Sequence, residues 1–378
     1  MISRYQGLTW DHPRGFAALF AAEREIAPAG LLHWEKQPLE GFESHPIGDL
    51  AARFDLLVLD HPHIGEAASL DCLLPLAELF SPQELARWAA ATIGPAMASY
   101  RWQGAQFALP LDVATQVAVC GPDFLADAPD DWDAVIRLSE TAPVALSVAG
   151  PHAVLSFYSL LLSLGETPGG DELVADEQVG REALSILARL HSRAPGFSRH
   201  LNPIGLLEAM AAGAELAYVP LVYGYVTYAT PGDGRRALRF AEAPRGPSGR
   251  RGSVLGGTGM AITRRCRPDP LLLDHLRWLM STEAQTGFIP GHAGQPSAVA
   301  AWRDRAVNLA AGQFYATTLE TTAAAWVRPR FDGYIAFQND AAAALVDGLN
   351  AASPPAAILA VLRDLWRRAR ERARGPLS

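Results

Sequence analysis

Acidic, histidine and aromatic side chains follow apolar runs of the sequence at the points where these runs end or break. In chain order they are Trp10, Asp11, His12, Asp60, His61 and Asp112. In open α/β sheets the loops after the strands collect at one edge and hold ligands, so we expect these groups to share a site. Paired carboxylates and histidines are what general acid–base catalysis requires. If the protein is an enzyme, Asp11-His12 and Asp60-His61 are the candidate catalytic pairs.

The same loops could bind a small polar ligand without transforming it. Aspartates accept hydrogen bonds from hydroxyl groups, and Trp10 offers a flat apolar face that suits a sugar ring or a cation. Arg14 stands beside the start of a predicted helix, where free amides and a guanidinium suit a carboxylate or another anion. Each of these residues could instead have a structural role without touching a ligand. Asp11 or Asp60, for example, could cap a helix or turn.

A metal site and a bound cofactor are not expected. His61-Pro62-His63 is not a spacing that directs both rings at one ion on a helix or a strand. GxGxxG, P-loop, HExxH and GxSxG motifs are absent, and the glycine-rich segment 256–259 precedes a strand instead of opening a helix. Cys72, Cys120 and Cys266 are widely spaced, without a CxxC pair, which argues against structural zinc and a disulfide framework.

Composition limits the class of protein. The chain has 378 residues, 49% hydrophobic and 19% charged, which is enough for a large core and two domains. Lys and Arg number 32 against 40 Asp and Glu, giving a net charge of −8, so no basic field attracts nucleic acid. No window reaches the roughly 18 unbroken apolar residues of a membrane-spanning helix.

The periodicity of apolar residues predicts alternating strands and helices. Asp130-Asp131 and Asn202 are expected to cap helices, because their side chains accept the free amide protons of a first turn. The predicted strands are 7–10, 54–59, 107–111, 115–119, 143–148, 215–221, 237–242 and 259–263. The predicted helices are 16–25, a helix from about 132, 154–164, 179–191, 203–212, 271–279 and most of 323–378. This order predicts an α/β fold.

Several different short motifs follow one another over nearly the whole chain. They are LLPL (73–76), SYRWQG (99–104) with QFALP (106–110), GGTGMAI (256–262) and WLMSTEAQ (278–285). In this order they resemble the type II periplasmic or extracellular solute-binding proteins of family 1, the group that includes the sugar-binding components of ABC importers.

The resemblance implies a two-lobed type II periplasmic-binding-protein fold with a hinge and a ligand cleft between the lobes. Residues 1–112 and 255–305 would form the first lobe, and 113–254 and 306–378 the second, with crossovers near 111–115 and within 244–255. Tyr223, Tyr225, Gly257 and Thr258 would join the strand-end residues at the cleft. An ABC permease would be a partner if the protein is exported.

Two functions remain open at this point. The leading one is a solute-binding protein that captures a small polar ligand, a sugar or an organic acid; the alternative is a cytoplasmic enzyme on the same fold that uses the Asp and His residues for acid–base chemistry. Met1 lies only six residues before the first predicted strand, with no signal-peptide pattern. As written, the sequence predicts a cytoplasmic protein, or a periplasmic one if a signal was removed.

Overall fold

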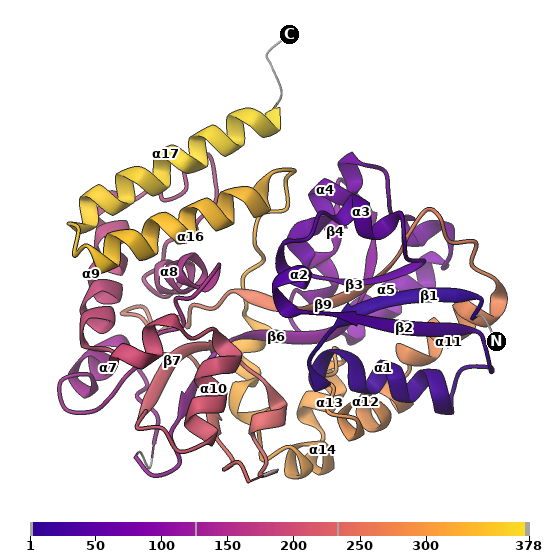
Figure 1. Cartoon of the computed structure of the whole chain (residues 1–378), viewed down its shortest axis with the longest axis horizontal. Coiled ribbons are helices and arrows are strands. Elements are labelled where there is room, and N and C mark those ends of the chain that lie inside the picture. Colours follow the sequence, from indigo (N-terminus) through magenta and orange to yellow (C-terminus); the bar gives the residue numbers. More distant parts are fainter. Residues whose placement is uncertain (1–2, 125–126, 233, 375–378) are drawn as a thin grey trace.

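A computed structural model describes residues 3–124, 127–232 and 234–374. It has two α/β lobes side by side, joined by strands that run through both (Figure 1). The expected fold class is therefore confirmed. The start of the chain, residues 1–2, and its last four residues, which the predicted lobe boundaries include, lie outside the described residues.

The first lobe is built on a mixed sheet in the strand order β2-β1-β3-β9-β6. β1 (Tyr5–Trp10) runs parallel to β2 (Leu32–Gln37) and to β3 (Leu56–Leu59). β9 (Leu255–Ile262) is antiparallel to β3, so the start of β9 lies beside the end of β3. This arrangement brings the ends of β1 and β3 and the start of β9 to one edge, which is the edge that faces the second lobe (Figure 1).

β6 (Ala108–Cys120) is the main connection between the lobes. It is buried along its whole length, pairs with β9 through its first half, and pairs with β7 (Tyr218–Tyr223) and β8 (Arg239–Ala241) through its second half. The prediction of two strands interrupted at Asp112 was wrong. The strand continues through Asp112 because Arg14 neutralises this buried carboxylate.

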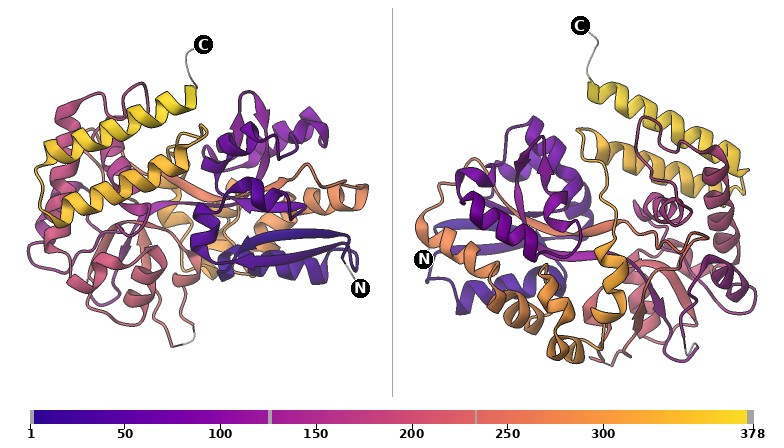
Figure 2. Two further views of the ribbon diagram at one scale, coloured as in Figure 1. Left: turned by 45° about the horizontal axis from the view of Figure 1, so that its top comes forward. Right: turned by 180° about the vertical axis from the view of Figure 1, so that it is seen from behind.

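Helices enclose the second lobe. α8 (His152–Ser163) is buried at every position, and it is packed by α9 (Glu177–Arg193) and α16 (Tyr334–Asn350). α17 (Pro355–Arg374) covers α16 and α9 from outside (Figures 1 and 2). α7 (Trp132–Leu138) and α10 (Pro203–Ala211) begin at the predicted caps, Asp131 and Asn202, whose side chains accept backbone N–H groups.

Further helices and strands complete both lobes. In the first half of the chain they are α1 (Pro13–Glu25), α2 (Leu39–Ser44), α3 (Ile47–Ala51), α4 (Ile64–Ser69), α5 (Pro82–Ala91), α6 (Ala96–Ser99), β4 (Arg101–Trp102) and β5 (Ala105–Gln106). In the second half they are α11 (Pro270–Leu279), α12 (Ile289–Gly291), α13 (Val299–Arg303), α14 (Arg305–Ala310) and α15 (Leu319–Ala323).

Two further differences from the sequence prediction concern backbone pairing. The predicted strand 143–148 does not form. This segment makes only one isolated β-bridge, between Val144 and Tyr218, and its remaining residues pair with no strand. The segment from α15 to α16 forms an additional connection between the lobes (Figure 2), and Val254 pairs with Trp326 on it.

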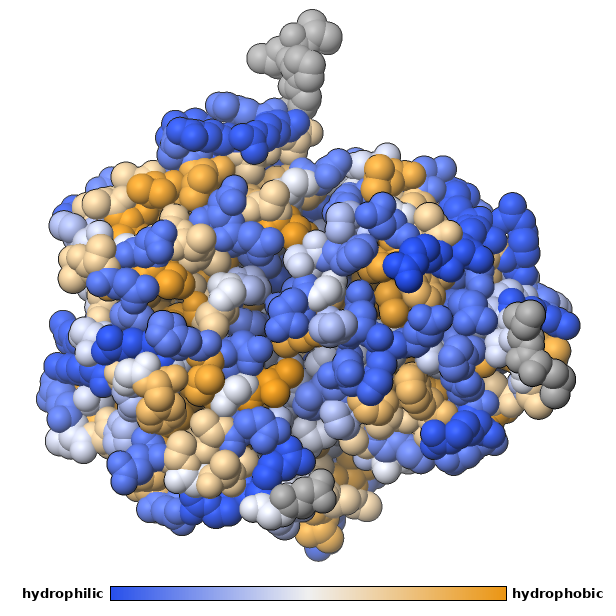
Figure 3. Space-filling model, viewed as in Figure 1, coloured by the Kyte–Doolittle hydropathy of each residue, from blue (hydrophilic) through white to orange (hydrophobic). Residues whose placement is uncertain are grey.

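In the part of the chain that the structure describes, no helix is both long and apolar enough to cross a membrane. The face shown in Figure 3 is mostly hydrophilic, and its hydrophobic residues form scattered groups. The outward side of α17 is a hydrophilic band at the top of this view.

Candidate functional site

A cavity of about 60 Å³ lies between the lobes, at the edge where β1 and β3 end and β9 begins. Several segments far apart in the sequence supply its walls. The lining residues are Trp10, Arg14, Leu39, Phe42, Glu43, Asp60, Pro151, His152, Leu155, Tyr223, Tyr225, Gly256, Gly257, Thr258, Arg328, Ile335 and Gln338. The cavity is large enough for about four to six water molecules, at roughly 10–15 Å³ of such space each.

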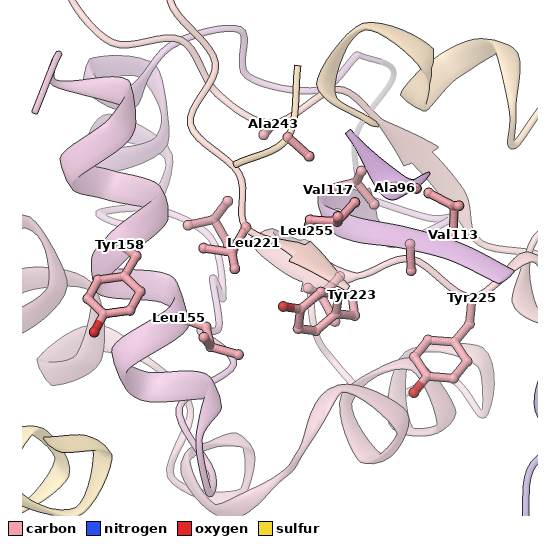
Figure 4. Close-up of a cluster of buried hydrophobic side chains, with 14 of the residues drawn as sticks. Ala96, Val113, Val117, Leu155, Tyr158, Leu221, Tyr223, Tyr225, Ala243 and Leu255 are labelled. Atoms are coloured by element: carbon pink, nitrogen blue, oxygen red, sulfur yellow. The ribbon is translucent and has the colours of Figure 1, made fainter. Parts of the chain in front are cut away.

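Aromatic rings form much of the wall. Trp10, at the end of β1, packs against Phe42 of α2 and, edge to face, against Tyr225 of the second lobe. Figure 4 shows Tyr223, at the end of β7, beside Leu155 of α8, and both line the cavity. The site therefore has flat apolar faces from both lobes, as a sugar ring or another partly apolar ligand requires.

Arg14 and Asp112 form a buried ion pair behind this wall. Arg14 Nε donates to Asp112 Oδ2 over 2.7 Å, Nη2 donates to Asp112 Oδ1, and Nη1 donates to the Gly224 carbonyl over 3.1 Å. The Arg14 guanidinium also lies 4.6 Å from the centre of the Tyr225 ring. Because α1 carries Arg14 and Gly224 follows β7, this one side chain connects the first lobe, the β6 crossover and the second lobe.

A second ion pair joins Asp60, which is half-buried just after β3, to the buried Arg328 on the segment that leads to α16. Burial opposes the charge on Asp60, but Arg328 and His61 hold the pKa of this carboxyl well below its usual range. Arg328 Nη1 also donates to Gln338 Oε1 of α16 over 3.0 Å. The second pair therefore bridges the lobes on the side of the cavity nearer α16.

Glu43 and His152 face each other at the outer end of the cavity. The Glu43 carboxylate lies 3.6 Å from His152 Nε2, and both residues also line a second hollow outside the first. Burial, reinforced by the charge of Asp60, raises the pKa of Glu43 to about 7. Burial, reinforced by Arg328, lowers the pKa of His152 to about 3. At neutral pH, His152 is therefore uncharged, and Glu43 holds a proton more readily than an exposed glutamate does.

Four buried polar atoms of cavity-lining residues have no hydrogen-bond partner in the structure. They are Trp10 Nε1, His152 Nδ1, Tyr223 Oη and Arg328 Nε. Buried polar groups are almost always hydrogen-bonded, and each one left alone costs about 1–3 kcal/mol. These four atoms are themselves shielded from the cavity, and unpartnered buried atoms also occur elsewhere in the described residues.

The structure brings seven of the predicted site residues to the cavity: Trp10, Arg14, Asp60, Tyr223, Tyr225, Gly257 and Thr258. Asp112 lies behind the wall, bonded to Arg14. Gly257 has a φ of +96°, and a Cβ there would lie 2.3 Å from the Asp112 carbonyl oxygen, so only glycine lets β9 pass this point of β6.

Besides Asp112, three predicted residues do not line the cavity. The Asp11 side chain is 49% exposed and pairs with Lys36. His12 accepts the backbone N–H of Arg14 as the cap of α1 and stacks on Trp10. His61 is fully buried, and its Nε2 accepts the backbone N–H of Arg328. The two Asp-His pairs therefore do not converge on one space.

Sequence reasoning missed several lining residues, chiefly Glu43, His152, Arg328 and Gln338. Arg328 lies in a segment whose apolar residues follow neither helical nor strand periodicity, so no local pattern indicates a site residue there. Glu43 and His152 are on helices that flank the cleft, not at strand ends. Within the described residues, no group of three or more His, Cys, Asp and Glu side chains is arranged to hold a metal ion.

No family model matches the chain, and no curated protein matches its sequence. Solved structures do match along nearly its whole length. One is an ABC transporter solute-binding protein from Agrobacterium radiobacter K84 in complex with ribitol, at 17% identity and a TM-score of 0.80, covering 97% of this chain and 98% of that one. Maltose-bound MalE3 from T. maritima gives 17% identity and a TM-score of 0.79 with the same coverage.

A third match is the GacH receptor of Streptomyces glaucescens, described unliganded and with acarbose, at 15% identity, a TM-score of 0.78 and 98% coverage of both chains. At these identities the similarity is one of fold. The protein has the two-lobed fold of the ABC transporter solute-binding proteins.

Proposed function

We propose that the protein is a solute-binding protein that captures a small polar ligand in the cavity between its lobes. The observation that carries this is a cavity whose walls come from both lobes and combine aromatic rings with charged and amide side chains. A ligand bound there would touch both lobes at once, so its binding energy would favour the closed arrangement over an open one.

The size and lining of the cavity favour a ligand of about the size of one sugar unit. Aromatic rings from Trp10, Phe42 and Tyr223 can cover apolar ring or chain faces, and charged and amide side chains can bond hydroxyl or acid groups. The structurally similar proteins carry ribitol, maltose or acarbose. We take a hydroxylated small molecule as the ligand class for this chain by analogy with them.

Acid–base catalysis is less well supported. An acid–base pair must reach the same substrate, yet Asp11 faces solvent and His61 is buried behind the wall. Asp60 is bonded to Arg328 and is held in its ionised form. The arrangement favours binding over turnover.

An ABC permease is the partner that this function implies, and the protein would then act outside the cytoplasmic membrane. The similar structures are described as components of ABC transporters, which supports the periplasmic or extracellular option. They give no support to the expectation of a cytoplasmic protein.

The test is ligand binding with a variant that fills the cavity. Leu155 is buried and lines the cavity, so Leu155→Trp should abolish binding of a sugar or polyol that raises the melting temperature of the native protein. Val361, 49% exposed on α17, provides the matched control, and Val361→Trp should bind normally. Small-angle X-ray scattering should show a smaller radius of gyration with the ligand than without it. If no ligand from a panel of sugars, polyols and sugar acids raises the melting temperature, the proposal fails.

A further inference from the structure

Glu43 is a carboxylate of the cavity wall that the described part of the chain leaves without a counter-charge. The two arginines that line the cavity are each paired with an aspartate, in the pairs Arg14–Asp112 and Arg328–Asp60. The ion-pair contact of Glu43 is with His152 Nε2 at 3.6 Å, and His152 is uncharged at neutral pH because burial and Arg328 lower its pKa to about 3. The two arginine pairs are neutral overall, so Glu43 sets the net charge of the cavity.

The hollow outside the cavity is also acidic. Glu43 and His152 line both spaces, and Glu40, which lies three residues earlier and is exposed, lines the outer hollow. The described residues that line this hollow include neither Lys nor Arg. A molecule that enters the cavity from this side therefore passes two carboxylates before it reaches the arginine pairs, and the local field attracts a cation.

Glu43 and Asp60 retain acceptor sites for a ligand. Their side chains line the cavity and are 28% and 18% exposed, respectively. The Glu43 carboxylate oxygens accept no hydrogen bond from the described residues, and both retain accessible surface. Asp60 accepts from the backbone N–H of His61 and from Arg328, but each carboxylate oxygen has two lone pairs. The site can therefore accept further hydrogen bonds, and it has one negative charge to compensate.

These features distinguish between ligands of one size. A hydroxyl group can donate one hydrogen to Glu43, but it leaves the charge of the carboxylate uncompensated. An ammonium group donates up to three hydrogens and supplies the missing charge, and bonds between two charged groups are the stronger kind. Resting on the proposed function, we propose that the ligand is a hydroxylated amine of monosaccharide size, an amino sugar or amino polyol, whose ammonium group binds the Glu43 carboxylate.

Binding of an ammonium group would depend on the protonation of Glu43. The titratable and charged groups that face Glu43 are Glu40 on its own helix, Asp60 and His63 after β3, His152 of α8, His200, Tyr223 and Tyr225 at and after the end of β7, and Arg328. A bound cation stabilises the ionised carboxylate, so binding weakens as the pH falls through the pKa of Glu43, which burial raises to about 7. An amine should therefore bind several-fold more tightly at pH 8 than at pH 6.

The experiment compares matched ligands by isothermal titration calorimetry on the full chain: D-glucamine against D-glucitol, and D-galactosamine against D-galactose. Each pair differs by one ammonium group in place of one hydroxyl group. At pH 7, at least one amine should bind about ten-fold or more tightly than its neutral partner. The pH dependence is measured with D-glucamine, because its aliphatic ammonium group, like that of lysine, keeps its proton from pH 6 to pH 8.

Two variants test the role of Glu43. Glu43→Gln keeps the size of the side chain and an acceptor oxygen but removes the charge. It should weaken amine binding about ten-fold, remove most of the pH dependence, and change the binding of the neutral partner much less. Glu78→Gln removes the same charge from an exposed position of the first lobe that lines neither hollow, and it should leave amine binding unchanged.

The outcomes separate this inference from the proposed function. If the preference for the amine is below ten-fold in both pairs, or if the neutral partners bind more tightly, the inference is overturned and the binding function stands. A preference for amines that survives Glu43→Gln also overturns it, because another group would then hold the ammonium. If neither member of either pair binds at millimolar concentration, the inference and the proposed function fall together.

Discussion

Removal of one charge from the Arg14–Asp112 pair should destabilise the protein far more than removal of a charge at the surface. The side chains are only 3% and 5% exposed. Asp112→Asn would leave the Arg14 guanidinium buried without a counter-charge, which costs about 3–5 kcal/mol. Arg14→Met should cost a similar amount, because it leaves the Asp112 carboxylate unpaired.

The double variant Arg14→Met, Asp112→Asn removes both charges and should cost less than the sum of the two single changes. We expect a coupling energy of about 2 kcal/mol or more, since each single change includes the penalty of one stranded charge. The exposed pair Lys36–Asp11 is the control, and Asp11→Asn should cost at most about 1 kcal/mol.

The assay is urea unfolding at pH 7, followed by both circular dichroism and tryptophan fluorescence. Coincident transitions from the two probes would justify a single free energy of unfolding for the two-lobed chain. The reasoning is refuted if Asp112→Asn costs no more than Asp11→Asn, or if the single changes at Arg14 and Asp112 simply add.

Three further predictions concern strain, acid stability and thiol reactivity. Gly257→Ala should lower the free energy of unfolding by about 2 kcal/mol or more, because of its positive φ and its clash with Asp112. Gly249 also has a positive φ, of +79°, but open space around it, so Gly249→Ala measures the cost of the backbone conformation alone in the same urea assay. Burial and Arg328 lower the pKa of His61 to about 4 and of His152 to about 3, so the unfolded chain binds protons that the folded chain does not, and each histidine should lower stability by roughly 1 kcal/mol per pH unit between about pH 6.5 and 4. The raised pKa of Glu43 acts in the opposite direction, so the test compares the native chain with His152→Gln: the loss of melting temperature from pH 7 to 5 should be smaller in the variant, and an equal loss contradicts this. Burial raises the pKa of Cys266 to about 12, so iodoacetamide should modify it at pH 8 far more slowly in the folded chain than in urea, and equal rates would contradict its burial.

The elements that could be predicted from the sequence are those with a local physical signal. The all-apolar run of β3 and the caps Asp131 and Asn202 act within a few residues of themselves, and they appear where expected. β2 was missed because only Leu32 and Trp34, its two buried side chains, are apolar. The other residues of the strand are polar, so the alternation is too short to indicate a strand.

The residues that line the cavity could be predicted only in part, because only some of them carry a local signal. Trp10 and Asp60 were found because they follow strands. Arg328 was missed because its partner Asp60 is 268 residues away, and Asp112 was misread as a strand break because Arg14 is 98 residues away. Pairings over such separations come from the tertiary fold, and a single sequence carries no sign of them.

The position of the Arg14 contact has a mechanical consequence. Arg14 and Asp112 lie beside the strands about which the lobes would turn, whereas Glu43 and His152 lie at the outer end of the cavity. As in a door, atoms next to the axis of rotation travel little and atoms at the free edge travel far. A small rotation would therefore separate Glu43 from His152 and admit a molecule while the arginine kept its bonds. The Asp60–Arg328 pair and the contact of Trp10 with Tyr225, which also cross between the lobes, would set most of the cost of opening.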